Sequence, residues 1–195
     1  MRTISRTNIE VRDIVISVLV LSVAFAVMFN NRGGFEDIDI FGLLGISAAI
    51  VCASFVSHEL AHKFTAQKFG AWAEYRMFPL GLMLALMMSF LGVIFAAPGV
   101  VYIKGYIDER MNGKISAAGP AVNIMFGFSA AAAAIITSGM LSSVFWITAS
   151  INAFFAVFNM IPVMPFDGAK IYRWNVPVYI FMLASAIALL AVVLL

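Results

Sequence analysis

Both histidines of this chain, His58 and His62, lie in the segment 57–62, SHELAH, which has the residue types of a hydrolytic metal site. Residues four apart project from the same face of a helix, so both imidazoles can reach one zinc ion. Glu59 lies beside them and can take a proton from a water molecule that zinc activates. The alternative is a pair of satisfied histidines at a helix end, but ionisable groups in apolar segments are rare and usually functional. We therefore predict a site for one Zn²⁺ per chain.

A catalytic zinc needs a third protein ligand, which must be an Asp, Glu or Cys residue. No other histidine exists, and the single cysteine, Cys52, lies in an apolar run. Asp167 follows Pro162 and Pro165, which end a helix, so we expect irregular backbone to present its carboxylate. An ordinary helix-ending turn is the alternative interpretation. We expect the other acidic residues to lie near the ends of the first apolar run or on the far side (Glu10, Asp13, Glu36, Asp37, Asp39), at a solvated interface (Glu74) or in a solvated loop (Asp108, Glu109).

The elements that position these residues are membrane helices, because 63% of the 195 residues are hydrophobic and 11% are charged. The net charge of +2 comes from scattered basic residues, which excludes nucleic acid as the main partner and leaves the lipid bilayer. A span needs roughly twenty apolar residues. The runs that meet this need are 14–31, 38–59, 77–103, 115–166 and 174–195, of which the fourth holds two helices separated by polar residues at 137–143.

The run 77–103 is apolar enough to cross, but its prolines and glycines and its end, Val100-Val101-Tyr102-Ile103, favour a re-entrant hairpin with a short strand. With a hairpin, nearly all Lys and Arg fall on one side of the membrane, which predicts that the N-terminus and the site face the cytoplasm. The hairpin also places Asp167 on the same side as the histidines, whereas a full crossing would separate them. We expect five to six transmembrane helices and a hairpin or short β segment around 77–107.

Three motifs resemble those of the site-2 protease family of intramembrane zinc metalloproteases. They are His58-Glu59-Leu60-Ala61-His62, the pattern Asn-x-x-Pro-x-x-Pro-x-Asp-Gly over 159–168, and Ala-Gly-Pro at 118–120 followed by Asn123. The resemblance implies that His58, His62 and Asp167 bind zinc, that Glu59 is the base, and that Asn159 lies near the substrate carbonyl. Two departures are Ala169, where many members have glycine, and the longer apolar stretch after Pro79. We expect one domain over 1–195 without a PDZ, CBS or other soluble domain.

These features predict a zinc endopeptidase of the cell membrane, multi-pass, that cuts transmembrane protein substrates. A substrate helix must unwind before hydrolysis, and we expect the segment 99–107, with Val100, Val101, Tyr102 and Ile103, to hold it by strand pairing. An interfacial loop is the alternative interpretation of that segment. The rival function is an intramembrane metal or proton transporter that uses the same His and Asp residues. The sequence does not fix the oligomeric state or the substrate.

Overall fold

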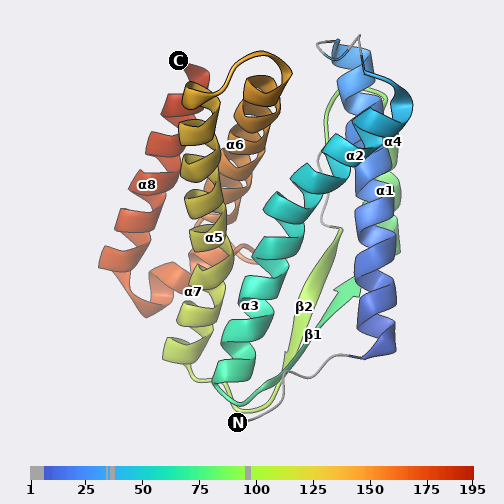
Figure 1. The fold of residues 1–195 in the computed structure, drawn as a ribbon. Helices are drawn as coiled ribbons and strands as arrows, with labels where there is room; N and C mark the ends of the chain where they lie inside the picture. Colours follow the sequence, from blue (N-terminus) through green and yellow to red (C-terminus); the bar gives the residue numbers. More distant parts are fainter. Residues whose placement is uncertain (1–6, 34, 36–37, 95–97) are drawn as a thin grey trace. The chain divides into compact units, whose positions relative to one another are not determined.

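Helices make up most of the computed structural model, which describes residues 7–33, 35, 38–94 and 98–195 (Figure 1). Five helical segments of the described residues are long and apolar enough to cross a membrane. This confirms the prediction of an all-α polytopic membrane protein. These segments are Asn8–Asn31, Ile40–Lys68, Glu109–Ile136, Gly139–Asn159 and Val176–Leu194.

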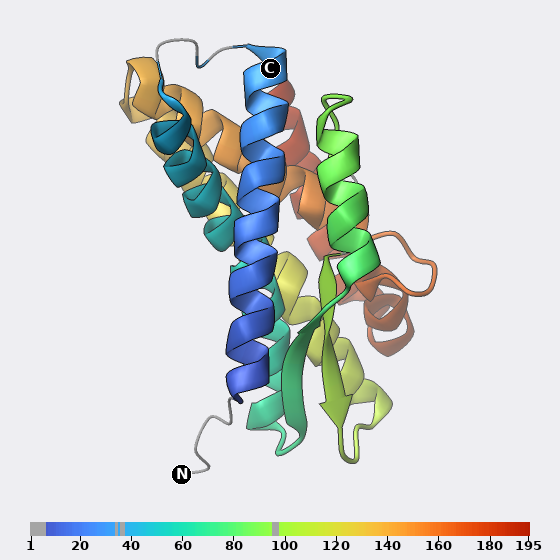
Figure 2. The same cartoon turned by 90° about the vertical axis from the view of Figure 1, so that its right-hand side faces the viewer.

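The chain divides into two compact units, of which the first comprises Met1–Cys52 and Ala73–Tyr102. Its longest helix, α1 (Asn8–Arg32), packs against α2 (Ile40–Val51) and α4 (Pro79–Ser89). Figure 2 shows α1 running alongside the strands and α4.

Helix α1 begins six residues before the predicted start of the first span. Its first turns contain polar and charged residues, which a prediction based on apolar runs leaves out. The Oγ1 atom of Thr7 caps the helix by accepting the backbone N–H of Glu10 at 3.2 Å. Glu10 and Asp13 are 1% and 3% exposed, so these carboxylates are buried inside the unit.

A two-stranded sheet joins β1 (Trp72–Met77) to β2 (Gly99–Lys104). Strand β2 confirms the strand expected at its residues, although it ends before the predicted limit of 107. The sequence interpretation missed β1, and the prediction that Glu74 is solvated was wrong, since its side chain is fully buried. The N–H of Phe78 donates to the carbonyl of Pro98 at 2.8 Å, and Lys104 lies over the ring of Trp72, so the strands run antiparallel.

Helix α4 has 11 residues, too few to cross a bilayer by itself. Pro79 stands in its first turn, where a missing N–H does no harm. Of the run 77–103, residues 95–97 lie outside the described residues. A strand, a short helix and a second strand are the described parts of this region, which fits the re-entrant hairpin rather than another long span.

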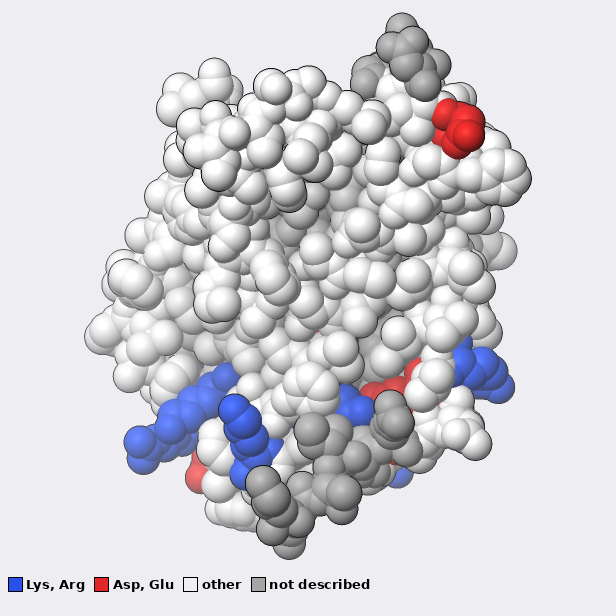
Figure 3. All heavy atoms as spheres, viewed as in Figure 1, with Lys and Arg blue, Asp and Glu red and all other residues white. Residues whose placement is uncertain are grey.

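The second unit comprises Ala53–Trp72 and Ile103–Leu195 and is organised around α5 (Glu109–Ile136). Helix α5 packs against α3 (Ser57–Lys68), α6 (Gly139–Asn159), α7 (Asp167–Trp174) and α8 (Val176–Leu194). Small residues permit close contact, as in the buried cluster of Ala130, Ala131 and Ala149. On the face drawn in Figure 3, white spheres cover the middle of this unit, and blue Lys and Arg spheres lie at the end where α5 begins.

The breaks around α6 differ in detail from those predicted. The predicted polar break at 137–143 is confined to Thr137 and Ser138, because α6 begins at Gly139. The hydroxyl of Ser142 donates to the carbonyl of Ala134 at 2.8 Å and so satisfies an end group of α5. After α6, a turn that includes both prolines leads to Asp167, which is the first residue of α7 rather than part of irregular backbone.

Candidate metal centre

His58, His62 and Asp167 converge inside the second unit and could hold a metal ion. The two Nε2 atoms lie 3.0 Å apart. The Oδ2 atom of Asp167 lies 3.1 Å from Nε2 of His62 and 3.6 Å from Nε2 of His58. All three residues are buried, with 8% exposure or less. The spatial convergence that the ligand prediction requires is therefore present.

The spacing of these three atoms suits zinc. Zinc binds imidazole nitrogen and carboxylate oxygen at about 2.0–2.2 Å in a tetrahedron, so two ligand atoms should lie about 3.3 Å apart. The three observed separations, 3.0, 3.1 and 3.6 Å, bracket this value. Burial alone would raise the pKa of the Asp167 carboxyl, but the neighbouring His62 and His58, in their protonated form, lower that pKa below its usual range. A carboxylate binds a metal in its ionised form, which is the form that Asp167 would take as a zinc ligand.

Helix α5 fixes both imidazoles from behind. The Nδ1 atom of His62 lies 2.8 Å from the carbonyl oxygen of Ile115, and Nδ1 of His58 lies 2.5 Å from Oδ1 of Asn123. A carbonyl oxygen only accepts, so the Nδ1 atom of each ring carries the proton and donates it. The lone pair then resides on Nε2, which is the atom that faces the other ligands.

Asn123 is itself held in one orientation by partners on two other elements. Its Nδ2 atom donates to the carbonyl of Ser54 and to Oδ1 of Asn152, at 2.8 Å in both cases. The Nδ2 atom of Asn152 in turn donates to the hydroxyl of Ser54 at 2.8 Å. Asn123, Asn152 and Ser54 are at most 1% exposed, so this network is a rigid buried support for His58.

A π-helical turn, η1 (Cys52–Val56), precedes α3 and supplies one of those partners. In a π turn the N–H groups bond five residues back rather than four, so a carbonyl becomes available for another donor. The carbonyl of Ser54, which lies in this turn, accepts the amide of Asn123. The turn therefore links the backbone just before the histidines to α5.

Two glycines allow the close approach that the centre needs. A Cβ atom on Gly119 would overlap Nε2 of His62 and Cε1 of His58, so α5 passes directly against the imidazoles only because the residue is glycine. A Cβ atom on Gly168 would overlap the carbonyl of Met160, so glycine lets α7 begin against the end of α6. Glycine at these places explains, in steric terms, two positions of the motifs found in the sequence.

The structure places the other predicted site residues less decisively. Glu59 is half-buried and lies on α3 between the two histidines in sequence. The Nδ2 atom of Asn159 donates to the carbonyl of Phe155 in its own helix at 3.0 Å, so its place near a substrate carbonyl stays a prediction. Val100 and Tyr102 are exposed on β2 and Val101 is buried, while their role toward substrate also stays a prediction.

Sequence reasoning missed the supporting residues Asn152, Ser54 and Ile115, and used Asn123 only as part of a motif. Asn123 and Asn152 are polar residues in the middle of apolar runs, and that signal could have pointed to them. Ile115 contributes a backbone carbonyl, for which no side-chain signal exists.

Comparisons with known proteins agree with this centre. The chain is 39% identical over 173 residues to a Methanocaldococcus jannaschii protein named "Putative zinc metalloprotease MJ0611", covering 85% of this chain and 84% of the relative. It is 29% identical over 147 residues to "Putative zinc metalloprotease Rip3" of Mycobacterium tuberculosis, covering 72% of this chain and 33% of that protein. No family model and no solved structure matches. The relatives, the spans and the His/His/Asp cluster together show that the chain belongs to the site-2 protease-like family of zinc metalloproteases.

Proposed function

We propose that this protein is an intramembrane zinc endopeptidase that hydrolyses peptide bonds of transmembrane substrates, as in regulated intramembrane proteolysis. The observation that carries the proposal is the His58, His62 and Asp167 cluster, with separations that suit tetrahedral zinc. A helix-based metal site in a chain with five apolar spans points to substrates that are themselves in the membrane.

The residues around the cluster have separate tasks in this mechanism. When bound, zinc supplies Lewis acidity toward the substrate carbonyl and acidifies a water molecule. Glu59 removes a proton from that water and later delivers it to the nitrogen of the leaving amine. Asn159 donates its amide to the substrate carbonyl region once substrate displaces the bond to Phe155.

Strand β2 holds the unwound part of the substrate by backbone pairing. Its Val100 and Tyr102 side chains are 51% and 55% exposed, which leaves the strand accessible along that face. Proline at Val101 and at Ile103 removes backbone N–H groups and should reduce cleavage, whereas Val101→Thr keeps the N–H and the branched shape. Unchanged cleavage by folded proline variants would contradict this role of β2.

We place the N-terminus and the metal centre on the cytoplasmic side of the cell membrane. Basic residues near the ends of the spans support this orientation. A cysteine-accessibility experiment on intact cells tests it, with single cysteines at Lys114 and at Asp39, because the orientation predicts that only the second is labelled from outside. Labelling of the cysteine at position 114 alone would show that the orientation is the opposite one.

The decisive experiment measures zinc per chain in detergent-purified protein together with cleavage of a model transmembrane substrate. Wild type and Glu59→Gln should each contain about one zinc, and only wild type should cleave, because Gln cannot accept the proton. Asp167→Ala should bind zinc more weakly. Glu109→Gln changes an exposed carboxylate at the start of α5 and serves as the matched control.

Three results would contradict the proposal. Full zinc retention in Asp167→Ala would mean that the third ligand is another residue. Cleavage by Glu59→Gln would mean that the reaction does not use this base, and metal movement by the same variant without any cleavage in wild type would favour the transporter.

A further inference from the structure

The two long edges of the β1–β2 sheet differ, because carboxylates of α1 occupy the outer edge of β1. The backbone N–H of Tyr75 donates to Oε1 of Glu10 at 3.0 Å. The N–H of Met77, two residues along the same strand, donates to Oδ2 of Asp13 at 3.4 Å. Both carboxylates are buried, and all four residues belong to the first unit.

The spacing of the acidic pair matches the spacing of the strand amides. Successive N–H groups on one edge of a strand lie about 6.7 Å apart, and a rise of three helical residues covers about 4.5 Å. The longer side chain of Glu10 makes up the difference at one end of the pair. Helix α1 thus supplies acceptors to the β1 edge in the way a third strand would.

The register of the sheet identifies which groups of β2 face outward. Phe78 pairs with Pro98 through a hydrogen bond, and Lys104 lies over the ring of Trp72, so the two strands pair in one antiparallel register. In that register Tyr75 lies opposite Val101, and because the Tyr75 N–H points away from β2, the N–H of Val101 points away from β1. The backbone groups of Gly99 and Ile103 face the same way.

The outer edge of β2 has no second strand beside it in the part of the chain that the structure describes. The outer edge of β2 therefore offers the backbone groups of Gly99, Val101 and Ile103 for pairing. On the outer edge of β1, the N–H groups are already bonded to carboxylates.

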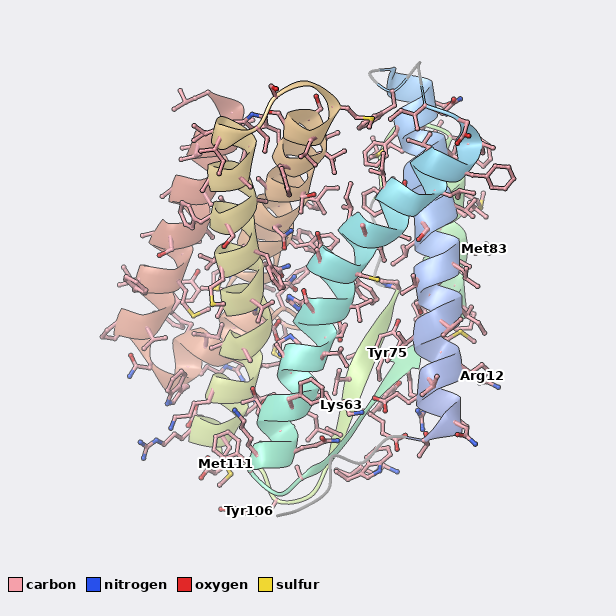
Figure 4. All side chains as sticks on the ribbon, in the orientation of Figure 1. Arg12, Lys63, Tyr75, Met83, Tyr106 and Met111 are labelled. Atoms are coloured by element: carbon pink, nitrogen blue, oxygen red, sulfur yellow. The ribbon has the colours of Figure 1, made fainter. Side chains whose placement is uncertain are left out.

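Tyr75 fixes this arrangement at the first residue of β2. Its hydroxyl lies 2.8 Å from Oγ of Ser17 on α1 and donates to the carbonyl of Pro98 at 3.1 Å. A Cβ atom on Gly99 would overlap the Tyr75 ring, so glycine is required for the ring to lie across the strand. Figure 4 labels Tyr75, between the strand and α1, and Arg12, on the outer side of α1.

We infer that Glu10 and Asp13 are positioning residues that close the β1 edge, so that an unwound transmembrane substrate pairs with β2 alone. This inference rests on the proposed protease function and adds what selects the edge. Unsatisfied N–H groups in apolar surroundings are costly and attract any strand that can satisfy them. Without the carboxylates, β1 would offer a substrate a second edge. A substrate paired with β1 would not lie in the position on β2 from which it is cleaved.

The first test measures amide hydrogen exchange in the free protein. Replacing both carboxylates, Glu10→Ala with Asp13→Ala, should speed exchange at Tyr75 and Met77 by about tenfold or more, the scale of one lost hydrogen bond to a charged group. The amide of Phe78, which bonds to Pro98, should keep its protection and so reports that the sheet remains folded.

Two further proteins make this test specific. Glu10→Gln with Asp13→Asn keeps acceptor oxygens and should restore most of the protection, which separates hydrogen-bond acceptance from charge. Glu109→Gln is the acidic control on α5 and should leave exchange at Tyr75 unchanged. Equal exchange at Tyr75 and Met77 in wild type and the double alanine protein, with both folded, would overturn the inference.

The second test adds a transmembrane substrate peptide to Glu59→Gln protein, which should bind it without cutting. The peptide should slow exchange at Val101 and Ile103 and leave Tyr75 unchanged. With Glu10→Ala and Asp13→Ala added to the Glu59→Gln protein, the peptide should slow exchange at Tyr75 and Met77 as well. In protein that keeps Glu59, the same double alanine substitution should lower the rate of cleavage severalfold. Peptide protection at Tyr75 in protein with intact Glu10 and Asp13 would overturn the inference.

The outcomes separate this inference from the proposed function. Absence of zinc or of any cleavage in wild type would contradict the proposed function. The exchange pattern of the free protein would still establish that the β1 edge is closed. If wild type cleaves its substrate and the substrate also slows amide exchange on β1, the inference that substrate pairs with β2 alone would be wrong. The protease assignment would remain.

Discussion

Replacing Asn123 with alanine should weaken zinc binding without touching a ligand. The change removes the acceptor for Nδ1 of His58, which lies 2.5 Å away, and frees the imidazole to rotate or to change tautomer. Loss of such an outer partner typically lowers metal affinity by about 10- to 100-fold, or about 1.4–2.7 kcal/mol. We expect an effect in this range because Asn123 is fully buried and no solvent can replace it.

The same substitution should also lower the free energy of unfolding. Asn123 donates to the carbonyl of Ser54 and to Oδ1 of Asn152, and alanine leaves both acceptors without that donor. A buried polar group that loses its partner costs about 1–3 kcal/mol, so the loss at these two acceptors should be about 2–6 kcal/mol. Asn152→Ala should give part of this loss, yet change zinc affinity less than about fivefold, because the bond between Asn123 and His58 remains.

Competition with a fluorescent zinc chelator at fixed pH measures the affinity, and thermal melting in detergent measures the stability. Ser150→Ala is the matched control, because the Ser150 hydroxyl bonds to the carbonyl of Trp146 in its own helix. If folded Asn123→Ala protein bound zinc within twofold of wild type, the reasoning that this amide orients His58 would be refuted.

Three other substitutions or treatments test the centre. Gly119→Ala should lower zinc affinity at least about tenfold, because the added methyl group overlaps the imidazoles and overpacking costs about 1–3 kcal/mol. Isothermal titration with zinc measures this affinity. Unchanged affinity would mean that α5 can shift to make room for the methyl group. Removing metal with EDTA should lower the melting temperature of wild type, since zinc at 1,000 times its Kd stabilises by about 4 kcal/mol, and should affect Asp167→Ala much less. Asn159→Ala should reduce kcat while zinc content stays constant, and a loss of zinc instead would make Asn159 a support of the centre.

The sequence was sufficient to predict the ligand-bearing elements because their signals are local. The four-residue spacing of His58 and His62 defines a helix face, and Pro162 and Pro165 end a helix just before Asp167. Apolar runs similarly predicted the spans, since a bilayer imposes their length. Such signals need no knowledge of which segments meet.

What the sequence did not predict depends on contacts between distant segments. Glu10 and Asp13 were expected near a span end, and nothing in α1 itself indicates that strand amides 65 and 64 residues away bond to them. Burial of Glu74 likewise depends on Thr7 and Arg76, which bond to its carboxylate. Strand β1 left a weak local trace, in that Glu74 and Arg76 alternate with less polar neighbours, but Trp72 and Tyr75 are both amphipathic, so the alternation is not strict.

Two buried polar networks among the described residues follow one physical rule with opposite results. In apolar surroundings each polar group needs a partner, and the partner determines what the group can still do. Asn123 bonds to Nδ1 of His58 and thereby directs the lone pair of Nε2 toward a metal. Glu10 bonds to the amide of Tyr75 and thereby removes that amide from competition for a substrate strand. Substituting either residue should therefore alter function through groups that it does not itself present to metal or substrate, which is why zinc affinity and amide exchange, rather than cleavage alone, are the measurements that identify its role.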